Sequence, residues 1–544
     1  MHIFRLLNTA ASASFRHILA VTCLAGLANA VLLGMINQAA EQAALAKPLG
    51  GTSLLLYVCM FAFFFVADRA SLREANRLVQ HRLEALRLRV VGKIRRVDLR
   101  ALERLSHGEL FATVAQEINH LSQSLPLLVS AAQSVFLLLF CLLYIATLSL
   151  ISFLVVAAFT AMGFYVYWLR RRSLNQALVQ VYHQEAEMLD ALTHFTKGFQ
   201  EIRLHADKND ALFRCFTQVV DDLQTNVVGV GRKWVVLLQF SNAFLYTLVG
   251  AVIFVLPIFF QGYTDIIYKI TAAAIFCVGP VTAITSAAPL YAKADMGLGH
   301  VAQLEERLNK GLAAKTPVVA QSRFNGFATI TCRDLAFSYR DDDGEASFTS
   351  GPLDLTLTRG ETVFLIGGNG SGKSTVMKLL CGLYTPESGR IEVDGTLVDE
   401  ADRQDYRELF SAIFTDFHLF DRLYGLGEVD PAEVTALIAR MELGGKVTFA
   451  NGRFSTTSLS TGQRKRLAMI VSLLEDRDIY LFDEWAADQD AHFREIFYTE
   501  LLPDLKRRGK TVLAVTHDDR YWSCCDRRLS MDLGMLSDDA EARA

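Results

Sequence analysis

The sequence predicts a chain in two parts: a membrane domain of six apolar helices, followed by a soluble α/β domain. At 544 residues the chain exceeds what one hydrophobic core usually fills. It is 51% hydrophobic and 21% charged, but several early stretches contain no charge, whereas the composition after about residue 320 is mixed. A glycine-rich segment, FLIGGNGSGKSTVMKLL, begins at Phe364. We therefore predict a membrane domain at residues 1–310, a linker at 311–325 and a nucleotide-binding domain at 326–544.

Five early runs lack Asp, Glu, Lys and Arg and are long enough to cross a membrane, which takes about 20 predominantly apolar residues. The third run is long enough for two helices, with a turn near residues 147–149. The six predicted spans are residues 18–40, 49–67, 125–147, 150–169, 235–262 and 270–292. The absence of these charges argues against a proton relay. Some polar side chains in the spans either line a cavity or join helices: Gln133, Tyr144, Tyr165, Gln239 and Asn242.

The loops set the orientation, because short cytoplasmic loops are enriched in Lys and Arg. Basic residues cluster after the second and fourth spans, Arg5 and Arg16 precede the first span, and Lys293 follows the sixth. Two of the opposite loops carry only one acid and one base each. Both termini are therefore predicted to be cytoplasmic. An alternative is a cleavable signal peptide ending near LAGLANA at residues 24–30. Cleavage would leave five spans and put the basic loops or the phosphate loop on the wrong side, so we prefer six spans in the lipid bilayer.

The two long connections at residues 68–124 and 170–233 have apolar residues at helical spacing. This spacing predicts helices that continue from the membrane into the cytoplasm. Their basic surface is a candidate for binding anionic headgroups as a secondary role. The small net charge of -4 gives no reason to expect nucleic acid as a partner, and the 9 cysteines show no metal-binding spacing.

The glycine-rich segment has the spacing of a phosphate-binding loop. Gly367, Gly372, Lys373 and Ser374 satisfy GxxxxGK[ST], between an apolar strand and a helix. Glycines let backbone N–H groups close around phosphates at a helix N-terminus. Lys373 brings positive charge to the outer phosphates, and the Ser374 hydroxyl is a candidate ligand for Mg²⁺.

A second apolar strand, in DIYLFDEW, ends in two acids, Asp483 and Glu484. The first is placed to hold Mg²⁺ directly or through water, because carboxylate oxygen is a preferred ligand of this ion. The second is placed to act as a general base toward the attacking water. The two motifs together predict a site for nucleotide hydrolysis.

Three further segments carry a resemblance: LSTGQRKRL from Leu459, FSYR from Phe337 and VTHDD from Val515. With the phosphate loop and the acidic strand, they resemble the ATPase domain of ABC transporters. Six spans followed by one such domain resemble an ABC exporter half-transporter of the type IV fold. The resemblance covers essentially the whole chain and implies an ATP hydrolase coupled to transport, with ATP and Mg²⁺ bound.

The resemblance also implies roles for single residues. The implied ATP-binding residues are Tyr339, which stacks on adenine, and Gly367, Gly368, Asn369, Gly370, Ser371, Gly372, Lys373, Ser374 and Thr375. The implied Mg²⁺ ligands are Ser374 and Asp483, and the implied catalytic residues are Glu484 and the switch histidine His517. The implied signature, which contacts ATP held by the other subunit, is Ser460, Thr461, Gly462 and Gln463, with Thr461 where the family usually has glycine. Asp490 matches the end of the loop that links the two sites.

One position departs from the family pattern. The family usually has a glutamine that contacts Mg²⁺ where this chain has Thr415, followed by Asp416. Threonine offers an oxygen but reaches less far, so metal ligation by Thr415 is left open and Asp416 is a candidate to act through water. Slower or differently coupled hydrolysis is the expected consequence.

One chain carries one phosphate loop and one signature, and the resemblance implies that each loop is completed by the signature of a second subunit. A twofold homodimer with two ATP molecules is therefore expected. Binding and hydrolysis would move the spans through helix tips at SHGELFATV from Ser106 and FTKGFQEIRLHA from Phe195.

The cargo is suggested by two segments, FTDFHLFD from Phe414 and LFDEWAADQDAHFREIFYTELLP from Leu481. They resemble the bacterial cyclic-peptide and siderophore exporter group, which contains pyoverdine-type and microcin-type exporters. This resemblance implies a peptide-derived compound moved from cytoplasm to periplasm across the bacterial inner membrane. The alternatives are a lipid or drug flippase or exporter, a siderophore importer, and an ATP-gated channel or sensor.

Overall fold

The computed structural model describes residues 12–44, 50–105, 108, 110, 113–114, 118–255, 267–312, 322–341 and 345–538. The chain divides into two compact units. The first comprises Met1–Lys93 and Leu105–Arg307, and the second comprises Ile94–Arg104 and Leu308–Ala544. Residues 313–321 of the predicted linker lie outside the described residues.

The first unit is built from long helices and two short ones, α8 and η2. They are α2 (Ser12–Ala44), α3 (Gly51–Ile94), α6 (Ile118–Leu148), α7 (Leu150–Lys197), α8 (Phe199–Leu204), α9 (Ala206–Gly250), the π-helical η2 (Ala251–Val255) and α11 (Ile267–Lys310). The chain turns between α6 and α7 at Ser149, which has an extended backbone. Its side-chain oxygen caps α7 by accepting a hydrogen bond from the Ser152 N–H.

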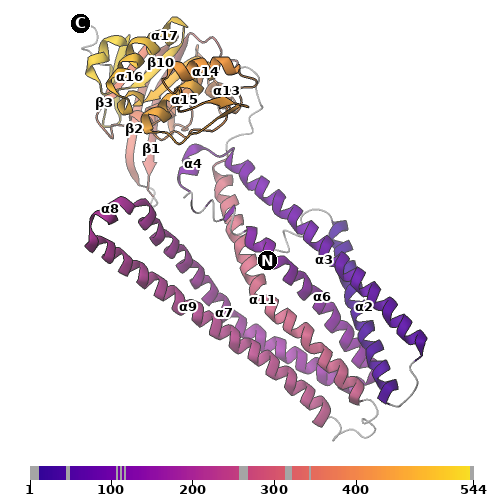
Figure 1. The fold of residues 1–544 in the computed structure, drawn as a ribbon. Coiled ribbons are helices and arrows are strands. Elements are labelled where there is room, and N and C mark those ends of the chain that lie inside the picture. Colours follow the sequence, from indigo (N-terminus) through magenta and orange to yellow (C-terminus); the bar gives the residue numbers. More distant parts are fainter. Residues whose placement is uncertain are drawn as a thin grey trace. The chain divides into compact units, whose positions relative to one another are not determined.

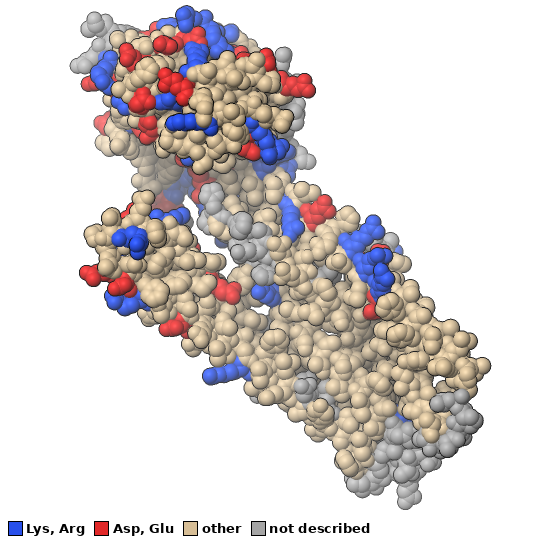
Figure 2. All heavy atoms as spheres, viewed as in Figure 1, with Lys and Arg blue, Asp and Glu red and all other residues tan. Residues whose placement is uncertain are grey.

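The described part of this unit contains five helices that are long and apolar enough to cross a membrane. They are Arg16–Ala43, Gly51–Ile94, Leu121–Leu148, Leu150–Leu169 and Lys269–Lys310. The predicted fifth span, residues 235–262, is described only to residue 255, where it contributes the shorter apolar helix Tyr246–Val255. The count of six spans therefore stays a prediction. Figure 2 shows a wide uncharged surface over this unit on the face drawn.

Helices α7 and α9 run side by side as an antiparallel pair joined at one end by α8 (Figure 1). Asn226 on α9 donates to Gln184 on α7 at 2.8 Å, which ties the two helices together. The side chains of Phe199 and Leu204 on α8 are exposed, in one of the two segments predicted as helix tips. Most of the other predicted tip, from Ser106, lies outside the described residues.

Two of the five polar candidates in the spans join helices. Gln133 donates to the Asp68 carboxylate at 2.9 Å, and Tyr144 accepts from Asn37 at 3.2 Å. These bonds link α6 to α3 and to α2. Tyr165 and Gln239 are exposed, and the side chain of Asn242 lies outside the described residues.

The second unit contains a six-stranded sheet in the order β12-β11-β3-β10-β9-β6. The strands are β3 (Thr362–Gly367), β6 (Phe410–Ile413), β9 (Ile479–Asp483), β10 (Thr511–Val515), β11 (Arg527–Asp532) and β12 (Met535–Asp538). All pair in parallel except β12, which is antiparallel to β11. Strands β9 and β10 are buried along their length, as expected for parallel strands covered on both faces.

A second, antiparallel sheet has the order β2-β1-β4-β5. Its strands are β1 (Thr329–Arg340), β2 (Ala346–Thr358), β4 (Ser388–Val393) and β5 (Thr396–Leu397), and β7 (Phe449–Ala450) pairs with β8 (Arg453–Phe454). The helices of the second unit are α4 (Leu99–Glu103), α12 (Lys373–Leu380), α13 (Arg403–Arg407), α14 (Pro431–Arg440), α15 (Thr461–Glu475), η4 (Trp485–Asp488), α16 (Ala491–Ile496), η5 (Phe497–Leu501), α17 (Leu502–Arg507) and η6 (Asp519–Cys524).

The parallel sheet separates two buried apolar clusters. Leu481 and Phe482, neighbours on β9, enter opposite clusters because successive side chains of a strand point to opposite faces. Tyr406 belongs to the first cluster, where it is fully buried and its hydroxyl donates to the Leu380 carbonyl at 2.6 Å. This bond ties α13 to the end of α12, the helix that follows the phosphate loop.

Replacing Tyr406→Phe should therefore lower the free energy of unfolding of the second unit by about 1–3 kcal/mol, because a buried carbonyl loses its donor. Thermal unfolding of the full-length protein measures the effect. Tyr424→Phe, at an exposed tyrosine, is the matched control and should change little. Equal unfolding temperatures for the two variants would contradict the expectation.

Candidate functional site

The phosphate loop lies where β3 ends and α12 begins. Gly367, the last residue of β3, has φ +147°, and a Cβ there would lie 2.2 Å from the Met531 carbonyl oxygen, so only glycine fits. Ser371 is buried, and its Oγ has no hydrogen-bond partner among the described residues. Gly372 caps the N-terminus of α12. The turn between Gly367 and Ser371 contains Gly368, Asn369 and Gly370, all exposed.

Lys373 is 6% exposed and reaches back into the loop. Its Nζ donates to the carbonyls of Gly367 at 3.0 Å and Gly368 at 2.8 Å. Burial lowers the pKa of Lys373, and the nearby carboxylates of Glu484 and Asp483 oppose this effect. An ammonium has three N–H groups, so two bonds to carbonyls leave one for a phosphate oxygen.

The two predicted Mg²⁺ ligands are hydrogen-bonded to each other at the carboxyl edge of the parallel sheet. Ser374 Oγ donates to Asp483 Oδ2 at 2.8 Å, and Asp483 is buried at the end of β9. A hydroxyl and a carboxylate oxygen fit Mg²⁺, which keeps several waters and binds substrate phosphates. No group of three or more His, Cys, Asp or Glu side chains in the described part of the chain forms a separate metal site. Phosphate oxygens and water are the usual further ligands of Mg²⁺ at a nucleotide site.

Thr415 contacts Asp483 through the main chain and not through the side-chain carboxylate. Its Oγ1 donates to the main-chain carbonyl of Asp483 at 3.5 Å. Asp416, the next residue, is exposed. The structure therefore places a threonine hydroxyl close to the Mg²⁺ candidates but turned to the backbone.

Glu484 and His517 are in contact. Glu484 Oε1 lies 3.1 Å from His517 Nε2, and the two residues follow the ends of β9 and β10. A cavity of about 350 Å³ opens beside them and is lined in part by Thr516 and Asp518. The Arg520 guanidinium beside Asp518 lowers the pKa of that carboxyl, so it stays ionised next to His517. The site thus holds a carboxylate, an imidazole and room for water.

Tyr339, the predicted adenine residue, lies at the end of β1. Its hydroxyl is 3.2 Å from Thr375 Oγ1 and donates to the Tyr384 hydroxyl at 3.3 Å. Tyr384 in turn donates to Glu103 Oε2 at 2.7 Å, which connects α4 to the nucleotide site. Sequence reasoning missed Tyr384 and Glu103, because no local motif marks either residue.

The signature residues open helix α15. The Ser460 N–H donates to the Gln463 side-chain oxygen at 3.4 Å, and Ser460 and Thr461 are exposed. Among the described residues, no hydrogen bond joins these signature residues to the phosphate loop of the same chain. An exposed helix N-terminus attracts an anion, so this segment is available to a phosphate from elsewhere.

Asp490 caps α16 by accepting from the Phe493 N–H at 2.8 Å. This bond and the Arg466 guanidinium lower the pKa of Asp490. Arg466 belongs to α15 and also donates to the Gln489 side chain at 2.9 Å. The loop that ends in Asp490 is therefore attached to the signature helix.

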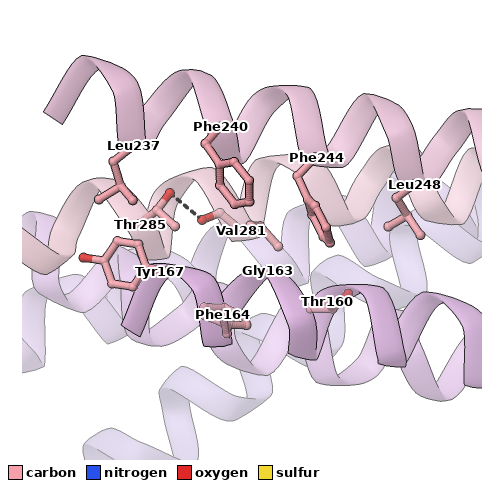
Figure 3. Close-up of a pocket in the computed structure, with 10 residues that line it drawn as sticks. All are labelled: Thr160, Gly163, Phe164, Tyr167, Leu237, Phe240, Phe244, Leu248, Val281 and Thr285. Carbon is pink, nitrogen blue, oxygen red and sulfur yellow. Dashed lines mark hydrogen bonds between the residues drawn. The ribbon is translucent and has the colours of Figure 1, made fainter. Parts of the chain in front are cut away.

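The membrane unit contains a small apolar cavity between α7, α9 and α11 (Figure 3). Its volume is about 30 Å³, roughly the share of one water molecule in the liquid. The hydroxyls of Thr160 and Thr285 in its wall donate to carbonyls of their own helices. None of the described residues that line it is charged, and its aromatic residues are Phe164, Tyr167, Phe240 and Phe244.

An α/β unit with this phosphate loop, joined to apolar helices of membrane-spanning length, defines a membrane-bound P-loop ATPase. The family model for the ABC transporter matches residues 351–487. Over 534 residues the chain is 31% identical to the ATP-binding protein SyrD of Pseudomonas syringae pv. syringae, a match that covers 95% of this chain and 93% of that protein. The chain belongs to the ABC transporter family.

Two further similarities extend this result. The structure of a bacterial Atm1-family ABC exporter with ATP bound matches 97% of this chain and 95% of its own, with a TM-score of 0.76 at 17% identity. This likeness concerns the fold, and it confirms the predicted class of type IV exporter helices followed by an α/β ATPase domain. The macrolide export ATP-binding/permease protein MacB of Shewanella sp. (strain ANA-3) is 31% identical over 204 residues, which cover 34% of this chain and 30% of that protein.

Thr415→Gln should raise the ATPase rate by about tenfold and lower the Mg²⁺ concentration needed, because an amide oxygen reaches further than a threonine hydroxyl. Steady-state ATPase measurements over a Mg²⁺ titration test this. Thr435→Gln on the exposed face of α14 is the control and should leave both quantities unchanged. Identical rates and Mg²⁺ dependence for wild type and Thr415→Gln would count against the interpretation of this site.

Proposed function

We propose that the chain is an ATP-driven exporter that works as a homodimer and moves a peptide-derived compound from the cytoplasm to the periplasm. The compound is a cyclic peptide, a siderophore or a siderophore precursor. Both termini are cytoplasmic, and the spans cross the bacterial inner membrane. The observation that carries the proposal is the exposed signature at Ser460, on a chain similar to an ABC exporter along nearly its whole length.

The dimer follows from an incomplete site. The phosphate loop and the signature of one chain make no hydrogen bond with each other among the described residues, although the family requires both around one ATP. A second copy, related by a twofold axis, supplies the missing signature to each loop. Two ATP molecules are then held between the subunits, each by Lys373 of one chain and Ser460 of the other.

Each residue of the site has a distinct task in hydrolysis. Lys373 and the backbone N–H groups of the loop would bind the phosphates, and Ser374 and Asp483 would hold Mg²⁺. When bound, Mg²⁺ neutralises charge that develops on the phosphates. Glu484 accepts a proton from the attacking water, and His517 orients the Glu484 carboxylate through their 3.1 Å contact.

Coupling to the spans requires a cytoplasmic contact. The pair of α7 and α9 ends in α8, which exposes Phe199 and Leu204. These two exposed apolar side chains are available for such a contact. We assign α8 to the transmission of movement between the ATPase domains and the spans.

The cargo assignment rests on the two segments that resemble cyclic-peptide and siderophore exporters and on the similarity to SyrD. A lipid flippase is the second candidate. A flippase would use the same ATPase motifs, and the described residues where α7, α9 and α11 meet form an uncharged, aromatic wall.

Mixed dimers test the trans arrangement. A Lys373→Ala chain and a Ser460→Arg chain should each be inactive alone, since every site then lacks one half. Mixed dimers, purified through two different tags, contain one intact site and should hydrolyse ATP about tenfold faster than either parent. A signature that acted within its own chain would leave the mixed dimers as inactive as the parents.

Inside-out vesicles test transport. Uptake of a cyclic peptide should require ATP, and Glu484→Gln should lower both uptake and hydrolysis by about 100-fold or more while nucleotide binding persists. Glu428→Gln, at an exposed acid outside the site, is the matched control. Flux on nucleotide binding alone would support a gated channel, and stimulation of the ATPase by lipids but not by peptides would support a flippase.

A further inference from the structure

A buried lysine follows the signature. Lys465 stands in the basic run RKR on α15, where a solvent-exposed side chain is usual, yet its side chain is only 2% exposed. Its Nζ donates to the Glu484 carbonyl oxygen at 2.7 Å and lies 2.6 Å from Asp488 Oδ2. A buried ammonium is costly unless it is paired and hydrogen-bonded. These two acceptors therefore fix where the loop after β9 lies relative to α15.

The carbonyl that Lys465 holds belongs to the residue placed to act as the general base. Glu484 has φ +49° and ψ +38°, a left-handed conformation that side chains other than glycine adopt only where their surroundings impose it. Its carbonyl also accepts from the Ala487 N–H at 3.3 Å. Fixing this peptide group fixes the direction of the side chain, whose carboxylate lies 3.1 Å from His517.

A second bond ties the same two segments together. Trp485 Nε1, one residue beyond Glu484, donates to the Lys465 carbonyl at 3.0 Å. Trp485 is fully buried and stacks on Phe497 with ring centroids 4.7 Å apart. Packing therefore fixes the indole. Two hydrogen bonds connect α15 to the segment at Glu484: one from the Lys465 side chain to the Glu484 carbonyl, and one from the Trp485 side chain to the Lys465 carbonyl.

We propose that Lys465 is a positioning residue for ATP hydrolysis: it holds the main chain of Glu484 from the signature helix of the same subunit, so that the carboxylate is aimed at the attacking water. This inference rests on the proposed function. Lys465 acts through Glu484, because its buried ammonium is engaged by the Glu484 carbonyl and Asp488. The general base of one site is thereby attached to the helix whose N-terminus completes the other site.

Steady-state kinetics of the full-length protein test the assignment. Lys465→Met keeps the length of the side chain and removes its N–H groups; it should lower kcat about tenfold and leave KM for ATP within about twofold. Asp488→Ala should lower kcat about threefold, and the double variant should be no worse than Lys465→Met, because both changes act on one interaction. Lys506→Met, in the exposed Lys506–Asp526 ion pair, is the control and should leave kcat unchanged.

Two results would overturn the inference. One is a kcat of Lys465→Met within twofold of wild type, and the other is a loss of kcat accompanied by an equal loss of ATP affinity. If Lys465→Met does not fold, Asp488→Ala decides, since Asp488 is half-exposed and its removal leaves α15 packed. An unchanged kcat in Asp488→Ala would then overturn it.

Mixed dimers separate this role from a general effect on α15. In a dimer of a Lys373→Ala chain and a Ser460→Arg chain, the intact site uses Glu484 of the Ser460→Arg chain. When Lys465→Met is added to the Ser460→Arg chain, the ATPase rate of the mixed dimer should fall about tenfold. When it is added to the Lys373→Ala chain instead, the rate should fall by less than about twofold. Equal losses in both placements would overturn the inference alone. An inactive mixed dimer without any change at Lys465 would instead refute the proposed function.

Discussion

The nucleotide site depends on the parallel alignment of β3, β9 and β10. Val515 on β10 pairs with Leu365 on β3 and with Asp483 on β9, so the three strands end at one edge of the sheet. Residues more than a hundred positions apart in the sequence meet there, and Ser374 and Asp483 approach to 2.8 Å. Ligands of open α/β sheets bind outside the carboxyl ends of the strands, where loops can supply N–H groups and carboxylates. Without this alignment the phosphate loop and the acids would be separate features.

Two buried lysines fix the backbone of the segments at this edge of the sheet by hydrogen bonds. Lys373 is held by carbonyls of the phosphate loop, and Lys465 by the carbonyl of Glu484. In each case a cation taken out of water is compensated by main-chain oxygens of a loop. Loop and lysine are therefore mutually dependent, since the carbonyls need a donor and the ammonium needs acceptors. The phosphate loop thereby gains a fixed geometry, and so does the start of η4, which follows Glu484 directly.

The sequence predicted what local patterns determine. The phosphate loop and the acidic strand each lie within a few residues, and their strand and helix context made the ATPase domain and the exporter class predictable, both of which are confirmed. Charge-free runs likewise predicted helices of membrane-spanning length. The burial of Lys465, and the link from Glu103 through Tyr384 to Tyr339, were not predictable because contacts between distant segments decide them. The sequence leaves Gln133 and Tyr144 open between cavity and packing roles for the same reason, because their partners Asp68 and Asn37 belong to other helices.

Two neighbouring signature residues, Thr461 and Gly462, differ in how much room the structure leaves for a side chain. Thr461 stands where the family usually has glycine, and its side chain is exposed at the first turn of α15, so an added side chain meets solvent. Gly462 has no such freedom, because a Cβ there would lie 2.7 Å from the Asp488 carbonyl oxygen. The same loop carries Gln489, which donates to the Gly462 carbonyl at 3.1 Å. Glycine is therefore required at the position where the loop after Glu484 packs on the signature helix, and a substitution at Gly462 would push apart the two segments that Lys465 holds together.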